Sequence, residues 1–114
     1  MTVPPRALGS AGEDAAAAWY EANGYEVLAR NWRCRDGELD LVVRRARTIV
    51  FCEVKARATG VFGSPAEAVN RTKRQRLRVL AAKFLDESPV RAREIRFDVV
   101  TVVGADVEVI EGAF

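Results

Sequence analysis

The segment from Thr48 to Ala56 restricts the fold of this chain more than any other part of the sequence. It is almost continuously apolar, with Ile49–Cys52 followed by Val54. A strand of this composition is typical of the centre of a sheet that is covered on both faces. We therefore expect an α/β fold in which a mixed central sheet is flanked by helices.

The rest of the chain supplies the other elements of such a fold in the order helix, three strands, helix, two strands. A helix is expected from about Ala11 to Asn23, because Ser10 and Glu13 fit a capping box at its start. With 114 residues, the chain has the size of a single domain. Apolar alternation and turn residues predict strands over residues 25–31, 38–45, 48–56, 95–103 and 107–111.

The second helix is expected to follow a capping signature at residues 64–67, where proline takes the first helical position. It continues to about Leu85, with a break near residues 70–72. Residues 57–63 are expected to form a loop, and residues 1–9 are expected to form a mobile arm.

The absence of histidine excludes several kinds of chemistry. Serine–histidine and cysteine–histidine mechanisms need an imidazole base, and many zinc sites need imidazole ligands. The two cysteines, Cys34 and Cys52, form neither a zinc motif nor a disulfide framework, and Cys52 is expected in the core. Chemistry must then use carboxylates, lysine, tyrosine or a metal ion with oxygen ligands, such as Mg²⁺ or Mn²⁺. No organic cofactor is indicated.

Neither a membrane segment nor a secretion signal is visible in the sequence. No apolar run approaches the roughly 18 residues that cross a membrane. Residues 1–10 lack the apolar core of a signal peptide. We therefore expect a cytoplasmic protein that does not bind membranes.

Charged residues interrupt two of the expected strands. Asp40 lies in the second strand, whereas Glu53 and Lys55 lie in the third and share a face, because strand side chains alternate in direction. A two-residue hairpin between these strands places Asp40 opposite Glu53, with Cβ atoms about 5 Å apart. Two carboxylates that close repel each other, and a divalent cation removes this cost.

A metal ion at this point would suit hydrolysis. Magnesium keeps some of its water ligands, and a lysine beside it can orient or deprotonate such a water. The trio of Asp40, Glu53 and Lys55 therefore predicts a site for phosphodiester hydrolysis. The alternative is a structural ion pair between Lys55 and one or both acids.

Positive charge is concentrated in one part of the chain. Residues 54–96 contain eleven Lys and Arg against four Asp and Glu, whereas the rest contains seven against twelve. This asymmetry favours an anionic partner, with DNA as the first candidate, and the alternative is a solvated helix face. Phe62 lies in a glycine-flanked loop and is a candidate for stacking on unpaired bases. The candidate phosphate-binding residues are Arg57, Arg71, Lys73, Arg74 and Arg76.

The spacing from Asp40 to Glu53-Val54-Lys55 resembles the PD-(D/E)XK nuclease superfamily. The wider sequence resembles the uncharacterised YraN-type bacterial family, which is related to archaeal Holliday junction resolvases. The resemblance extends from Gly12 to Val103. Its matching segments include Gly12-Glu13, Gly24-Tyr25, Arg30–Arg33, Gly37–Leu41, Val50–Arg57, Phe62-Gly63, Glu67–Val69, Lys73, Arg76-Leu77 and Arg96–Val100.

The resemblance implies a restriction-endonuclease-like fold and a metal-dependent endonuclease acting on DNA, including branched or flapped DNA. It implies that Asp40, Glu53 and the Val54 carbonyl hold Mg²⁺ and that Lys55 assists the water. It also implies that Glu13 joins the acidic cluster. A resolvase would need to be a homodimer to make two symmetric cuts.

Several alternatives stay open at this point. Glu13 fits either a helix cap or a metal ligand, and Glu38 is either a further ligand or a polar residue that starts its strand. Asp98 is expected to support Lys55 or Lys73, and Trp32 is expected to cover the core. Two other functions remain: a nucleic-acid-binding module without turnover, and an interaction protein whose acidic and basic halves pair with each other or a partner.

Overall fold

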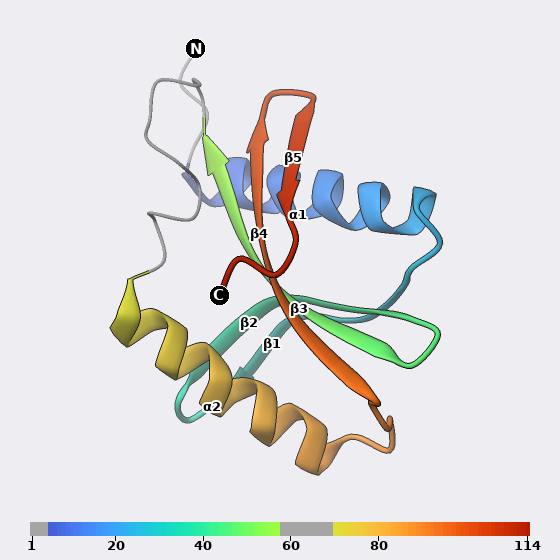
Figure 1. The fold of residues 1–114 in the computed structure, drawn as a ribbon. Coiled ribbons are helices and arrows are strands. Elements are labelled where there is room, and N and C mark those ends of the chain that lie inside the picture. The colour runs from blue at the N-terminus through green and yellow to red at the C-terminus, as the bar shows by residue number, and fades with distance from the viewer. Residues whose placement is uncertain (1–4, 58–69) are drawn as a thin grey trace.

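The computed structural model describes residues 5–57 and 70–114. Five strands form one sheet, and one helix lies on each of its faces (Figure 1). This is the expected α/β architecture and element order, and it is consistent with a restriction-endonuclease-like fold. In chain order the elements are α1 (Pro5–Ala22), β1 (Glu26–Cys34), β2 (Gly37–Arg45), β3 (Thr48–Arg57), α2 (Arg71–Glu87), β4 (Glu94–Val103) and β5 (Asp106–Ile110).

The strands lie in the sheet in the order in which they occur in the chain. Neighbouring strands are antiparallel except β3 and β4, which are parallel. A parallel pair needs a crossover connection, and α2 lies in the one between β3 and β4. The sheet is therefore mixed, and β3 is its central strand, as the apolar run predicts.

Side chains of β3 alternate between two separate cores. Ile49 and Phe51 belong to the core that α2 closes, whereas Val50 and Cys52 belong to the core that α1 closes. All four are at most 3% exposed. This burial on both faces explains why the strand is apolar at nearly every position.

Helix α1 begins at Pro5, well before Ala11. Ser10 therefore lies inside the helix, and its interpretation as the N-cap of a capping box with Glu13 is wrong. Proline is tolerated in a first helical turn, because the N–H that it lacks would have no partner there. Residues 5–9, which were expected in a mobile arm, belong to α1, and residues 1–4 lie outside the described residues.

The expected helix break near residues 70–72 is instead the start of α2. Asn70 is the N-cap, and its side chain accepts a hydrogen bond of 2.9 Å from the backbone N–H of Lys73. The expected cap at residues 64–67 lies outside the described residues. Arg57, which was expected in a loop, is the last residue of β3. Among the described residues, no helix is long and apolar enough to span a bilayer.

Strand β1 continues to Cys34 rather than ending near Asn31. Asn31 has a φ of 52°, which places its backbone in the left-handed region. Asparagine tolerates this region better than most residues do, so the strand passes through Asn31 without ending. Trp32 resumes the pairing with Leu39 of β2.

Candidate functional site

Asp40 lies where β2 and β3 cease to pair. The expected hairpin register is confirmed as far as the pair Leu41–Cys52, and within the described residues the ladder ends there. One step further along β2, Asp40 Oδ2 accepts a hydrogen bond of 2.9 Å from the backbone N–H of Val54. This bond holds the Asp40 carboxylate against β3.

Three carboxylates gather at this point. Glu13 of α1 and Glu38 and Asp40 of β2 each offer one oxygen atom, and these atoms lie within 4.8 Å of one another. Glu13 is positioned by Asn31, whose Nδ2 atom donates a hydrogen bond of 2.9 Å to Glu13 Oε2. Glu38 belongs to this cluster and also forms an ion pair with Arg33, whose Nε atom lies 3.3 Å from Glu38 Oε2.

Gly12 lets α1 approach the sheet beside this cluster. A Cβ atom added at Gly12 would lie 2.6 Å from the Cβ atom of Ala56, far closer than two carbon atoms normally pack. The glycine thus brings Glu13, its neighbour in the helix, close to β2. A glycine inside a helix lowers the stability of that helix by about 1 kcal/mol relative to alanine. Gly12, directly before Glu13, was therefore the feature of the sequence that could have indicated the close contact between α1 and the sheet.

Glu53 forms a second group of charges together with two lysines. Its side chain is 8% exposed, and its Oε1 atom lies 3.2 Å from Lys55 Nζ and 2.5 Å from Lys73 Nζ. Lys55 shares β3 with Glu53, whereas Lys73 reaches it from the first turn of α2. The sequence left open a structural ion pair between Lys55 and one or both acids, and such a pair is present between Lys55 and Glu53. Asp40 instead accepts a hydrogen bond from the Val54 N–H.

The pKa values reflect this crowding. Burial and the nearby Glu53 raise the pKa of Asp40 to about 7, against the opposing effect of the Val54 hydrogen bond. Burial and the neighbouring Lys73 lower the pKa of Lys55. Burial also disfavours the charged form of Lys73, but the contacts with Glu53 and Lys55 and the charge of Asp40 together outweigh it and raise the pKa of Lys73.

The donor set fits a hard divalent cation. Carboxylate oxygens are the ligands that Mg²⁺ and Mn²⁺ prefer, and the Glu13, Glu38 and Asp40 oxygens are close enough to bind one ion. Burial and the neighbouring acids raise the pKa of Asp40, so its charged form is disfavoured at this position. In this structure the carboxylate of Glu53 is instead bound to two ammonium groups.

The basic residues of α2 spread around the helix. Lys73 reaches the acidic site, Arg74 lies over the ring of Phe114, and Arg71 and Arg76 are exposed. Arg57 is half-buried at the end of β3. Phe62 lies outside the described residues. Among these candidates, Lys73 therefore forms an ion pair with the acidic site.

Two other expectations concern aromatic and acidic core residues. Trp32 is half-buried and packs edge-to-face on Phe84 with ring centroids 5.6 Å apart, which confirms its role in the core. The expectation that Asp98 supports Lys55 or Lys73 is wrong. Asp98 points into the other core, where α1 supplies its partner.

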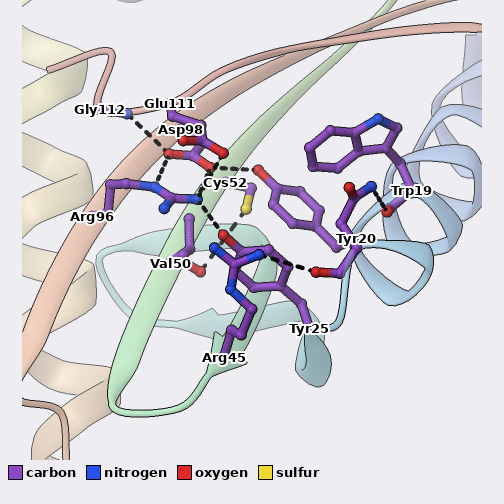
Figure 2. A network of polar contacts seen from close by, with 11 residues as sticks. Trp19, Tyr20, Tyr25, Arg45, Val50, Cys52, Arg96, Asp98, Glu111 and Gly112 are labelled. Atoms are coloured by element: carbon purple, nitrogen blue, oxygen red, sulfur yellow. Dashed lines mark hydrogen bonds and ion pairs between the residues drawn. The ribbon is translucent and has the colours of Figure 1, made fainter.

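Asp98 is fully buried and accepts several hydrogen bonds (Figure 2). Arg96 donates to both of its carboxylate oxygens at 2.8 and 2.9 Å, Tyr20 Oη donates at 2.7 Å, and the Gly112 N–H donates at 3.1 Å. Burial raises the pKa of Tyr20 well above its ordinary value, so the hydroxyl stays a donor. This network joins α1, β4 and the segment after β5, and its composition is that of a structural site.

Fold and site together define an α/β protein with a restriction-endonuclease-like sheet and a carboxylate cluster where β2 and β3 part. The model of the family described as "Uncharacterised protein family UPF0102" matches residues 12–102, a range that contains every carboxylate of the site. The chain belongs to this family.

Curated relatives carry the same family name. A UPF0102 protein of Beutenbergia cavernae is 57% identical over 97 residues, which cover 85% of this chain and 82% of the relative. A UPF0102 protein of Moorella thermoacetica is 47% identical over 120 residues, which cover 100% of both chains. A UPF0102 protein of Myxococcus xanthus is 43% identical over 113 residues, which cover 96% of this chain and 90% of the relative.

Proposed function

We propose that this protein is a metal-dependent endonuclease that hydrolyses phosphodiester bonds of DNA. The observation that carries the proposal is the gathering of Glu13, Glu38 and Asp40 within 4.8 Å, beside Glu53 with its two lysines. The half-buried Asp40 carboxylate lies near Glu13, Glu38 and Glu53, and a cation that binds there would offset the cost of its charge.

Asp40, Glu53, the Val54 carbonyl and Glu13 would hold Mg²⁺ or Mn²⁺. The hydrogen bond from the Val54 N–H to Asp40 Oδ2 places residue 54 beside the carboxylate, and the carbonyl of the same residue lies in the next peptide. A bound divalent ion would supply a polarised water and neutralise the negative charge that develops on the phosphate. Glu38 lies close enough to serve as an additional ligand.

Lys55 would hold and deprotonate the attacking water. Its ammonium group is already oriented by Glu53 at 3.2 Å. Its lowered pKa increases the fraction of neutral amine near neutral pH, and a neutral amine accepts a proton from water. The lysine therefore has both the position and the protonation behaviour that this role needs.

DNA would reach the site over the basic part of the chain. Residues 54–96 carry eleven Lys and Arg against four Asp and Glu. Exposed arginines on α2, such as Arg71 and Arg76, would contact phosphates on either side of the cut. Such contacts are independent of sequence, so the shape of the DNA would decide the preferred substrate.

A cleavage assay tests this proposal. The pure protein is incubated with duplex, single-stranded, flapped and four-way-junction DNA, with Mg²⁺ or Mn²⁺ present or chelated. We expect cleavage that needs the metal and is lost in Glu53→Gln and Lys55→Ala. Lys83→Ala is the matched control, because Lys83 also pairs with a carboxylate, that of Asp36, which is not part of the carboxylate cluster.

Two outcomes would contradict the proposal. Full cleavage by Lys55→Ala would show that the site lies elsewhere. Absence of cleavage on every substrate, with salt-sensitive DNA binding that survives Glu53→Gln, would leave a nucleic-acid-binding module without turnover.

A further inference from the structure

The contact between Lys73 and Glu53 joins two parts of the chain that the sequence separates. Lys73 Nζ lies 2.5 Å from Glu53 Oε1, although Lys73 belongs to α2 and Glu53 to β3. The lysine side chain is 34% exposed and the glutamate side chain is 8% exposed. The glutamate therefore lies inside the site, and the lysine lies at its solvent-facing edge, which we call the mouth of the site.

The backbone of Lys73 is fixed where it can make this contact. Asn70 Oδ1 accepts the N–H of Lys73 at 2.9 Å, which is the N-cap bond that begins α2. A cap of this kind stabilises the first turn of a helix. The first turn of α2 thus presents Lys73 to Glu53, and the lysine side chain is half-buried there.

Glu53 has more ammonium partners than a single buried carboxylate needs. Its Oε1 atom accepts from both Lys55 and Lys73, so the two ammonium groups are themselves close together. A carboxylate bound in this way is less available to a cation, since a cation must displace at least one positive charge. Lys55 is held by its position on β3, so Lys73 is the partner that leaves more easily.

We propose that Lys73 is a positioning residue of the metal site, an internal counter-ion that holds Glu53 and competes with the divalent ion for it. This inference rests on the proposed function, because it concerns the ion of the same site. When the ion binds, Lys73 leaves Glu53 and lies at the mouth of the site, where the phosphates of DNA are the next anions within reach.

Calorimetric titration of the DNA-free protein with Mn²⁺, and separately with Mg²⁺, tests the competition. Lys73→Met keeps the apolar stem of the side chain and removes its charge. We expect this variant to bind the ion about fivefold more tightly than the wild type, because a competing ion pair of about 1 kcal/mol is removed. Lys83→Met, on the same helix, should bind the ion like the wild type.

Lys73→Arg provides the rescue. It keeps a positive charge beside Glu53, so its affinity for the ion should stay close to that of the wild type. A thermal melt gives a second readout: without metal Lys73→Met should melt lower than the wild type, and saturating Mn²⁺ should raise its melting temperature by more than that of the wild type.

The outcomes separate this inference from the proposed function. If the wild type binds the ion and Lys73→Met binds it equally or more weakly, the competition is refuted while the metal site stands. If neither the wild type nor Lys73→Met binds the ion, the metal site of the proposed function is refuted, and the competition with it. If Lys83→Met changes the affinity for the ion as much as Lys73→Met does, the change follows from the net charge of the protein, and the specific role of Lys73 is refuted.

Discussion

Replacing Asp40 by asparagine should stabilise the metal-free protein and remove a ligand from the proposed metal site. Asparagine keeps an oxygen that accepts the N–H of Val54, so the hydrogen bond that holds residue 40 against β3 is retained. The substitution removes a negative charge that is partly buried and lies close to Glu13, Glu38 and Glu53. The expected gain in the free energy of unfolding equals the free energy that the wild type loses by keeping this charge at the half-buried position.

The pKa of Asp40 sets the size and the pH dependence of this gain. Folding raises it from 3.8 to about 7, so the folded state binds a proton that the unfolded state releases. The wild type therefore loses stability as the pH rises from about 4 to about 7, and the loss is complete above this range. Each pKa unit corresponds to about 1.4 kcal/mol, which gives an upper bound of about 4 kcal/mol.

Solvent at the open side of the site screens part of this cost. We therefore expect Asp40→Asn to be about 1–2 kcal/mol more stable than the wild type at pH 8, with a smaller gain at pH 5. Urea unfolding at both pH values measures the difference. Asp14→Asn is the matched control, because Asp14 is an exposed carboxylate of α1 whose replacement should change stability by less than about 0.5 kcal/mol.

Saturating Mg²⁺ should reverse the order of stability. Binding to the folded state stabilises the wild type, whereas Asp40→Asn lacks a ligand and should gain little. The reasoning is refuted if Asp40→Asn is no more stable than the wild type at pH 8 without metal, or if its gain is larger at pH 5 than at pH 8.

Three further substitutions test the packing that supports the site. Tyr20→Phe removes a hydrogen-bond donor from the fully buried Asp98, so it should cost about 1–2 kcal/mol in urea unfolding; an unchanged midpoint would contradict this network. Gly12→Ala places a Cβ atom 2.6 Å from that of Ala56, so a thermal melt should show a loss of about 1–3 kcal/mol; wild-type stability would mean that α1 does not press on β3 there. Asn70→Ala removes the N-cap of α2 and should cost about 1 kcal/mol, whereas Asn70→Asp should retain most of that stability.

The sequence predicted the parts of the site that depend on local patterns. Side-chain alternation along a strand is set by the backbone, so Glu53 and Lys55 were correctly placed on one face. The two-residue hairpin gave the correct register of β2 and β3 as far as Leu41–Cys52, one step short of the predicted pair of Asp40 with Glu53, and Asp40 instead accepts a hydrogen bond from the Val54 N–H. Both inferences need only neighbouring residues and ordinary backbone geometry.

Contacts between distant elements were harder to predict. Lys73 was expected to bind phosphate, and nothing in the order of residues shows that the first turn of α2 points at Glu53. Asp98 was assigned to a lysine because the face of β4 on which it lies depends on how the sheet packs, and its partners come from Tyr20 and Arg96. The start of α1 was misjudged because Ser10 and Glu13 imitate a cap inside a helix.

The parallel pairing of β3 with β4 has a consequence for how the site is assembled during synthesis. Every carboxylate of the site, and Lys55, lies in one continuous stretch from Glu13 to Lys55 that precedes the crossover. A growing chain emerges from the ribosome with its N-terminal part first. The carboxylates of the site therefore emerge before Lys73, and the ion pair between Glu53 and Lys73 is completed only when the first turn of α2 has followed β3 out of the ribosome.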